Sequence, residues 1–358
     1  MPSLKEIKVR INSISSTLAI TSAMKMVAAA KLQKAQMAIQ NMLPYERRLY
    51  SMLVDLMGAM NISAAASEDG SVRGSGSAER GFDQSGDRLS LSNRHDLAGM
   101  DGAYSLMAQR EVRKVAIVAF ASNSSLCGAF NSNAIREATA VINEYRASGL
   151  GDADITVYSV GRKMAEAMKK LGFPSPADFT KMSDSPSYDA ASALAQELFD
   201  GFVSGRFDKV ELVYNHYKST SSQPTTRQTY LPLSLADATA DLQAGKITDS
   251  ASESDTNRGA EPVGAPVVRQ GSPTTEDLIV EPSKEALIAT LLPKVIRLRI
   301  FTTLLDSAAA EHAARTVAMQ LATDNGNDLL QELTLEYNKG RQQKITSEIL
   351  DLVGGSMQ

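Results

Sequence analysis

The stretch LKEIKVRINSISSTLAITSAMKMVAAAKLQKAQMAIQ, residues 4–40, decides the fold of this chain, because its apolar residues recur at steps of three and four. An average spacing of about 3.5 residues is the period of a coiled coil, so this helix needs a partner helix. The stripe continues to residue 60, and fourteen of its seventeen positions are apolar: Leu4, Ile7, Ile11, Ile14, Leu18, Thr21, Lys25, Ala28, Leu32, Ala35, Ile39, Met42, Glu46, Leu49, Leu53, Leu56 and Met60.

A matching long helix is predicted only at the other end of the chain, over about 283–353. At 1.5 Å per residue it would be roughly 106 Å long, against roughly 88 Å for a first helix over 3–61, so its tip should project as a single helix. Pro44 predicts a kink in the first helix rather than its end, because the stripe continues beyond it. The predicted stripe of the second helix includes several polar positions: Ala310, Ala314, Val317, Leu321, Asp324, Asp328, Gln331, Leu335, Asn338, Gln342, Ile345, Ile349 and Leu352.

Between these helices, strand-like and helix-like segments alternate, which favours a largely parallel sheet with right-handed crossovers. Five strands are expected, the third of them short: Val115–Ala121, Ile155–Val160, Asp178–Met182, Lys209–Lys218 and Arg227–Leu233. Helices are expected at about Ser132–Ala147, Gly161–Gly172 and Ala190–Phe202.

The expected fold class is therefore α/β: an antiparallel coiled coil of long N- and C-terminal helices plus a central Rossmann-like α/β domain. The expected parts are an N-terminal coiled-coil helix (1–61), an α/β body (113–236) and a C-terminal coiled-coil helix (283–358). Polar insertions with their linkers, 62–112 and 237–282, separate them, because these segments are too poor in large apolar residues to form a core.

Composition argues against several classes of protein. The net charge of −4 gives no reason to expect nucleic acid, although residues 1–61 carry eight Lys/Arg against three Asp/Glu, which suggests either an acidic protein partner or a merely solvated basic face. One cysteine, Cys127, allows no internal disulfide, and three scattered histidines predict no metal site. We see no membrane-spanning run and no signal peptide.

Three segments resemble the gamma subunit of the bacterial F-type ATP synthase: Ile11–Gln36, Ser125–Asn133 (SLCGAFNSN) and Glu311–Gly355. They occur in the order found in that family. The sequence departs from the family at Asn123-Ser124-Ser125, where bacterial relatives usually carry Asp-Arg-Gly, and this puts in doubt any charge-based contact by that loop.

The resemblance implies a non-catalytic central rotor, without a cofactor, metal or catalytic residue of its own. Its implied partners are the alpha and beta subunits around the paired helices, and the epsilon subunit and the c-ring beneath the body. The membrane contact would be indirect, through the c-ring, at the cytoplasmic face of the bacterial inner membrane. By resemblance, Met24, Lys25 and Lys31 face acidic loops of the beta subunits, and a beta-subunit catch loop meets Arg341, Gln342 and Thr346.

Two other functions are compatible with parts of the sequence. A strand followed by a turn with Gly128 and a helix is the topology of a nucleotide-binding enzyme, but a dinucleotide fingerprint needs three glycines and no P-loop motif occurs. A static coiled-coil adaptor would show the same heptads. Alanine-rich segments and polar stripe positions argue against a permanent zipper, and the family motifs favour the rotor.

Overall fold

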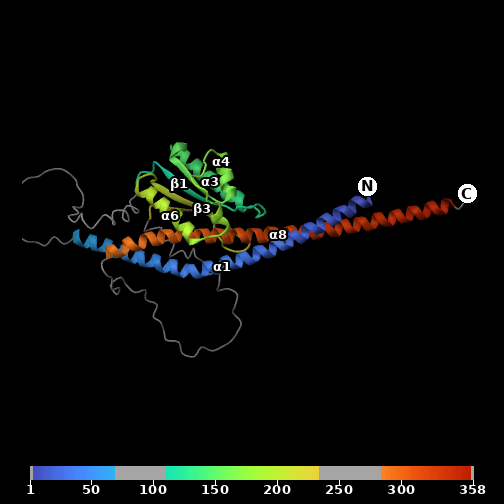
Figure 1. The fold of residues 1–358 in the computed structure, drawn as a ribbon, viewed down its shortest axis with the longest axis horizontal. Helices are drawn as coiled ribbons and strands as arrows, with labels where there is room; N and C mark the ends of the chain where they lie inside the picture. The colour runs from blue at the N-terminus through green and yellow to red at the C-terminus, as the bar shows by residue number, and fades with distance from the viewer. Residues whose placement is uncertain (1–2, 69–109, 234–283, 356–358) are drawn as a thin grey trace, which may run out of the picture.

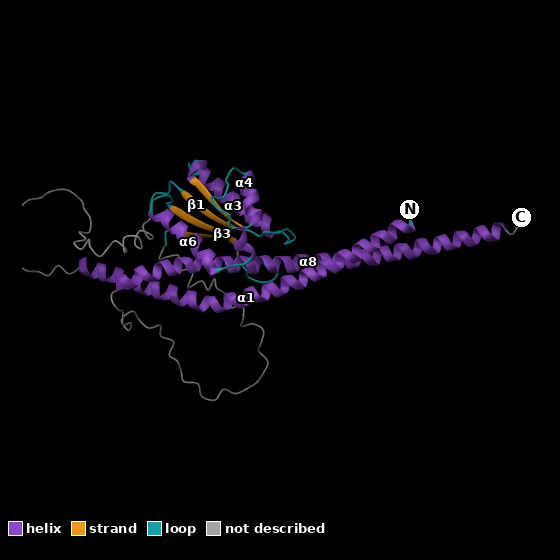
Figure 2. Cartoon of the chain, viewed as in Figure 1, coloured by secondary structure: helices purple, strands orange, loops and turns teal. Residues whose placement is uncertain are grey.

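The computed structural model describes residues 3–68, 110–233 and 284–355, which form a long helical rod with an α/β body against one side (Figure 1). Helix α1 (Leu4–Glu68) and helix α8 (Lys284–Gly355) run side by side in opposite directions. Within the described residues, every strand belongs to the body (Figure 2). The expected antiparallel coiled coil around a central α/β body is confirmed.

Helix α1 begins with reciprocal hydrogen bonds between Ser3 and Glu6. The Glu6 carboxylate accepts from the Ser3 backbone N–H at 3.1 Å, and the Ser3 hydroxyl accepts from the Glu6 N–H at 3.3 Å. Such a capping box satisfies backbone donors that a helix start leaves free. The helix continues through Pro44, as expected, and changes direction in the middle of its length (Figure 1).

The predicted α1 stripe faces α8. Every described side chain on it is buried or half-buried, including the polar Thr21, Lys25 and Glu46. The side chain of Met60 lies outside the described residues. The heptad pattern therefore located the inner face of α1 correctly.

The predicted stripe on α8 is wrong beyond Val317. Leu321 and Leu335 are 57% and 72% exposed, and the polar stripe positions from Asp324 to Gln342 also face outward. The face turned toward α1 carries smaller and mixed residues instead: Thr323, Gly326, Leu330, Leu333, Tyr337 and Gly340.

Two glycines explain this difference. A Cβ on Gly326 would lie 2.7 Å from Leu18 Cδ2, and one on Gly340 would lie 3.1 Å from Leu4 Cδ2. The leucines of α1 thus pack into holes that the glycines leave open. Glycine has no apolar side chain, so a search for apolar repeats does not detect these two inner positions. It selects the leucines on the outer side of α8 instead.

The body contains a four-stranded sheet in the order β2-β1-β3-β4. Strands β1 (Val115–Phe120), β2 (Ile155–Val160) and β3 (Lys209–Asn215) are parallel, and β4 (Thr225–Leu231) runs antiparallel to β3. The largely parallel sheet is confirmed. Every residue of β1 is buried, as expected of a continuous apolar strand covered on both faces.

Helices cover both faces of the sheet. Side chains of α3 (Phe130–Ala147) and α4 (Arg162–Lys170) form one core with residues such as Ile117 and Val157. On the other face, α6 (Tyr188–Val203) packs together with α8. A short 3-10 helix, η1 (Asp152–Asp154), precedes β2.

The expected strand at Asp178–Met182 is wrong. This segment holds a short helix, α5 (Thr180–Asp184). The Asp178 carboxylate accepts a hydrogen bond from the Thr180 backbone N–H at 2.9 Å, a local turn that competes with extended backbone. The expected insertions 62–112 and 237–282 lie almost entirely outside the described residues, although α1 continues to Glu68.

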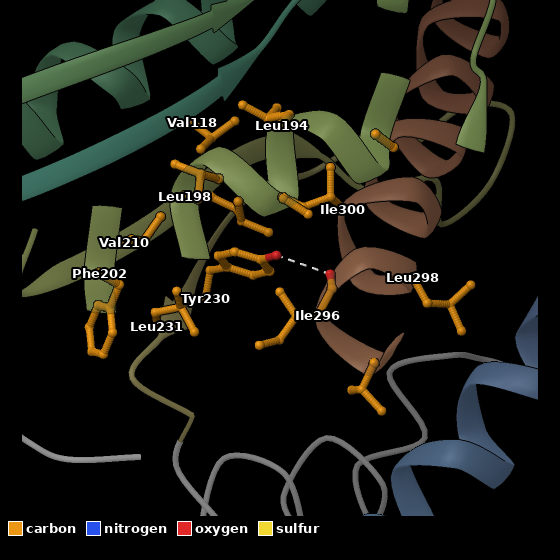
Figure 3. Close-up of a cluster of buried hydrophobic side chains, with 14 of the residues drawn as sticks. Val118, Leu194, Leu198, Phe202, Val210, Tyr230, Leu231, Ile296, Leu298 and Ile300 are labelled. Atoms are coloured by element: carbon orange, nitrogen blue, oxygen red, sulfur yellow. Dashed lines mark hydrogen bonds between the residues drawn. The ribbon is translucent and has the colours of Figure 1, made fainter. Parts of the chain in front are cut away.

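The second core joins the body to the rod (Figure 3). Tyr230 of β4 is almost fully buried, and its hydroxyl donates to the backbone carbonyl of Ile296 in α8 at 3.0 Å. Burial raises the pKa of the Tyr230 hydroxyl far above its usual range. Apolar residues of α6 and α8, among them Leu198 and Ile300, surround this bond (Figure 3). The sheet and the N-terminal half of α8 therefore share one core.

Candidate functional site

The C-terminal end of α8 extends beyond its partner helix (Figure 1). Gly340 lies opposite Leu4, the first residue of α1, so the helix continues without a pairing helix from there. Arg341, Gln342 and Thr346 all lie on this unpaired part and are exposed. The Thr346 hydroxyl donates to the Gln342 carbonyl at 2.9 Å, which places these two residues one turn apart on the same side.

This tip also exposes large apolar side chains. Those of Ile345, Ile349, Leu350, Leu352 and Val353 are between 43% and 74% exposed. Burying apolar surface contributes about 25 cal/mol per Å², so a concentrated apolar segment on a lone helix indicates an interaction surface. The tip therefore combines apolar residues with the polar groups of Arg341 and Gln342.

The candidate residues of α1 divide between two faces. Met24 and Lys31 are exposed, and with Ile20 and Val27 they form an outward row at helical spacing, here called the outer stripe. Lys25 lies in the seam instead, where its ammonium donates to Gln320 Oε1 at 2.7 Å. The structure thus brings Met24 and Lys31 together and separates Lys25 from them.

The sequence interpretation missed Ile20 and Val27. A signal for them existed, because both are large apolar residues off the heptad stripe. Such residues on a two-helix rod stay exposed unless a further protein covers them.

A polar cluster that the sequence did not indicate joins α8 to the loop after β1. The Arg315 guanidinium donates to Glu311 at 2.7 Å and to the Ser124 hydroxyl at 2.7 Å. Burial raises the pKa of Glu311, which is only 7% exposed, while the positive charges of Arg315 and Lys31 oppose that shift. In this chain the loop contacts α8 through the uncharged hydroxyl of Ser124, at the segment where relatives usually carry Asp-Arg-Gly.

Cys127 in the same loop serves packing. It is buried against Phe130 and Ala310, with the Asn131 amide 3.2 Å from its sulfur. Cys127 is therefore a small core residue.

The loop after β1 is closed on itself, which argues against nucleotide binding at the carboxyl edge of the parallel strands. The Asn131 side-chain oxygen accepts from both the backbone N–H and the hydroxyl of Ser122, each at 3.0 Å. A side chain on Gly161 would meet the Ala121 carbonyl at 2.0 Å, so the adjacent turn is also tightly packed. In a dinucleotide-binding fold this edge is an open crevice.

Within the described ranges, no three His, Cys, Asp or Glu side chains gather as metal ligands would. None of the helices in these ranges is both long and apolar enough to cross a membrane.

Comparison with known proteins gives a consistent result. The family model described as ATP synthase matches residues 3–357. The chain is 47% identical to the ATP synthase gamma chain of Phocaeicola vulgatus and 45% identical to that of Bacteroides thetaiotaomicron, each match covering 100% of both chains. The gamma chain of Flavobacterium johnsoniae is 35% identical over 99% of this chain and 98% of its own length.

These matches run through the whole chain, so the segments expected to be insertions are matched in these relatives. Among solved structures, the fold resembles a chain of the Euglena gracilis mitochondrial ATP synthase (OSCP/F1/c-ring), with a TM-score of 0.54, 19% identity, and coverage of 99% of this chain and 93% of that one. A rod of two end helices, a lone apolar tip and full-length similarity to gamma chains lead to one assignment: the chain belongs to the ATP synthase gamma chain family, whose members are non-catalytic subunits of that complex.

Proposed function

We propose that this gamma chain is a central rotor. The paired helices turn inside a ring of alpha and beta subunits, and the body rests on the epsilon subunit and the c-ring. Proton flow turns the c-ring, and the chain transmits that rotation to the catalytic head for ATP synthesis, or the reverse during hydrolysis. The chain associates with the membrane only through the c-ring, at the cytoplasmic face of the bacterial inner membrane.

The observation that carries this proposal is the exposed apolar tip of α8. Leu352 is 74% exposed and lies more than two turns beyond the last contact between Gly340 and Leu4. An apolar lone helix is unstable in water but suits the inside of a ring of subunits. Membership of the gamma chain family supports the alpha and beta subunits as the ring that surrounds the tip.

The shape of the rod supports rotation as the mode of action. The body lies on one side of the rod and α1 changes direction along its length, so the molecule has no symmetry about its long axis (Figure 1). An asymmetric rod of this kind presents a different face to each surrounding subunit, and that face changes as the rod rotates. Rotation would therefore place the catalytic sites of the beta subunits in different states in turn.

The proposed contacts with the beta subunits fall at two levels of the rod. Arg341, Gln342 and Thr346 would meet a catch loop near the tip, and the outer stripe with Met24 and Lys31 would meet acidic loops nearer the body. Lys25 would reach a beta subunit only by leaving Gln320. Each partly exposed contact between a cation and a carboxylate is worth about 1 kcal/mol or less, which torque and thermal motion can overcome.

Reconstitution tests this function. The purified chain is mixed with purified alpha and beta subunits of a related bacterium, and ATP hydrolysis and subunit composition are measured. We expect no hydrolysis by the chain alone, recovery of a complex that also binds epsilon, and stimulated hydrolysis in that complex. Turnover by the chain alone, or failure to bind alpha and beta subunits, would contradict the proposal.

A further inference from the structure

The segment directly after β3 joins the body to both helices of the rod. His216 Nδ1 lies 2.6 Å from the Asp306 carboxylate of α8, and the Tyr217 backbone N–H donates to the other oxygen of the same carboxylate at 2.9 Å. The Gln36 amide of α1 donates to the Tyr217 hydroxyl at 2.7 Å. These four residues, His216, Tyr217, Asp306 and Gln36, are here called the body–shaft lock.

The ring of Tyr217 occupies the junction of three elements. On one side it packs with a small apolar cluster between the helices, formed by Leu32 of α1 and Ala309 and Ala313 of α8. It also packs against a second small cluster, formed by Cys127 of the loop after β1, Phe130 of α3 and Ala310 of α8. One side chain directly after β3 therefore joins two clusters that hold residues of α1, α8 and the body.

The position of the lock along α8 gives it a mechanical role. The apolar core that joins the body to α8 runs from Ile288 to Leu304, and the lock follows at Asp306. This core, with the hydrogen bond from Tyr230 to Ile296 inside it, holds the body against the first part of α8. Hydrogen bonds are directional, and a second attachment beyond the end of the apolar core prevents the body from swivelling about it.

We propose that Asp306 and Tyr217 are positioning residues that fix the angle between the body and the shaft, so that torque passes between them without slip. This inference rests on the proposed rotor function. When ATP hydrolysis in the alpha and beta subunits turns the paired helices, the lock makes the body turn with them. When the c-ring turns the body, the lock makes the paired helices turn with it.

The test compares hydrolysis with proton pumping in the assembled complex reconstituted in vesicles. The variant Asp306→Ala combined with Tyr217→Ala should assemble and hydrolyse ATP near the wild-type rate, because neither residue lies in the proposed contacts with the head. The number of protons pumped per ATP should fall by about twofold or more, because the lost hydrogen bonds and ring contacts leave the locked angle less populated. Asp328→Ala, which removes an exposed acid from the same helix, is the matched control and should keep the wild-type ratio.

A distance measurement separates slip from general damage. Spin labels on Lys169→Cys in α4 and Glu332→Cys in α8, both exposed positions, report the angle in a Cys127→Ala background. The distribution of distances should broaden in the lock variant and stay narrow in the control. An unchanged distribution together with an unchanged pumping ratio would overturn the lock.

Two conservative variants decide the matter if the double alanine variant does not fold. Asp306→Asn removes the charge, and Tyr217→Phe removes only the hydroxyl that accepts from Gln36. Each of these two variants should pump fewer protons per ATP than wild type while keeping the same helical circular dichroism. A wild-type number of protons per ATP in both variants would overturn the lock. If the wild-type chain itself does not assemble with alpha and beta subunits, the rotor function fails and the lock fails with it.

Discussion

The Lys25 ammonium of α1 lies 2.7 Å from the Gln320 side-chain oxygen of α8, so the polar position in the middle of the heptad stripe is paired within the chain. Next to it, the hydroxyls of Thr323 and Thr21 are 3.1 Å apart. A polar layer in a coiled coil lowers stability and fixes the register of the two helices. Lys25 therefore belongs first to the seam of the rod.

Replacing this layer with apolar residues should stabilise the chain. The double variant Lys25→Leu with Gln320→Leu should raise the free energy of unfolding by about 1 kcal/mol, because leucines bury more apolar surface in the seam. Lys25→Leu alone should gain less, because the side-chain oxygen of Gln320 then loses the Lys25 donor. Urea unfolding of both single variants, the double variant and Lys34→Leu, an exposed control, measures the coupling. A double-variant effect equal to the sum of the two single-variant effects would show that the pair is not coupled.

The hole at Gly326 should tolerate little added volume. Gly326→Val should lower the free energy of unfolding by about 1–3 kcal/mol, because the new side chain meets Leu18. Gly326→Ala should be nearly neutral, since a gain in helix propensity of about 1 kcal/mol offsets the contact. Thermal unfolding of Gly326→Val with and without Leu18→Ala checks the cause. If Leu18→Ala does not restore part of the loss, the hole is not what limits the position.

The unpaired tip should affect turnover more than assembly. Arg341→Ala combined with Gln342→Ala removes groups able to bind a beta-subunit carboxylate with paired hydrogen bonds, but only a small part of a long interface. We expect normal recovery of the complex and reduced ATP-driven turnover. Lys339→Ala, an exposed cation just before the last contact with α1, is the control. Wild-type turnover in an assembled double variant would contradict the proposed role, as would a complex that does not assemble.

The lock should make stability depend on pH near neutrality. The hydrogen bond to Asp306 raises the pKa of His216, against the opposing effects of burial and of the Lys218 charge. A raised folded pKa means that the stabilisation is complete below the unfolded value of about 6.5 and is lost as pH rises through the folded value. The difference in melting temperature between wild type and His216→Gln should therefore shrink as pH rises from 5.5 to 8.5. A constant difference would show that His216 does not change its charge there.

His312 of α8 should give the opposite sign. Burial, together with the charges of Arg315 and Lys31, lowers its pKa to about 4. Its contribution is therefore present above the unfolded pKa of about 6.5 and is lost as pH falls toward 4. Melting temperatures of wild type and His312→Gln between pH 4 and 7 test this. A difference that grows as the solution becomes more acidic would contradict it.

The sequence predicted the inner face of α1 because leucine and isoleucine dominate it, and it predicted the parallel strands because β1 is a continuous apolar run. It could not predict the inner face of α8, where Gly326 and Gly340 form holes rather than knobs. The strand expected at 178–182 failed because Asp178 bonds locally to the Thr180 N–H.

The polar contacts between the body and the rod could not be predicted from the sequence either. His216 and Asp306 are 90 residues apart, and Ser124 and Arg315 are 191 apart. None of these pairs belongs to a periodic pattern. The candidate residues Arg341, Gln342 and Thr346 came from family resemblance, and their exposure on the unpaired tip is compatible with the proposed contacts without testing them.

The pairing of the first helix with the last also governs how the chain is made. Lys25 and Gln320 are separated by 295 residues, so at 5–20 residues per second α1 leaves the ribosome roughly 15–60 s before the residues that cover it. During that time its leucines have no partner, whereas the strands of the body, which are close in sequence, can already pair. The paired helices are thus the last part of the molecule to form, and a chain that ends before Gly340 leaves the first turn of α1 without its partner residues.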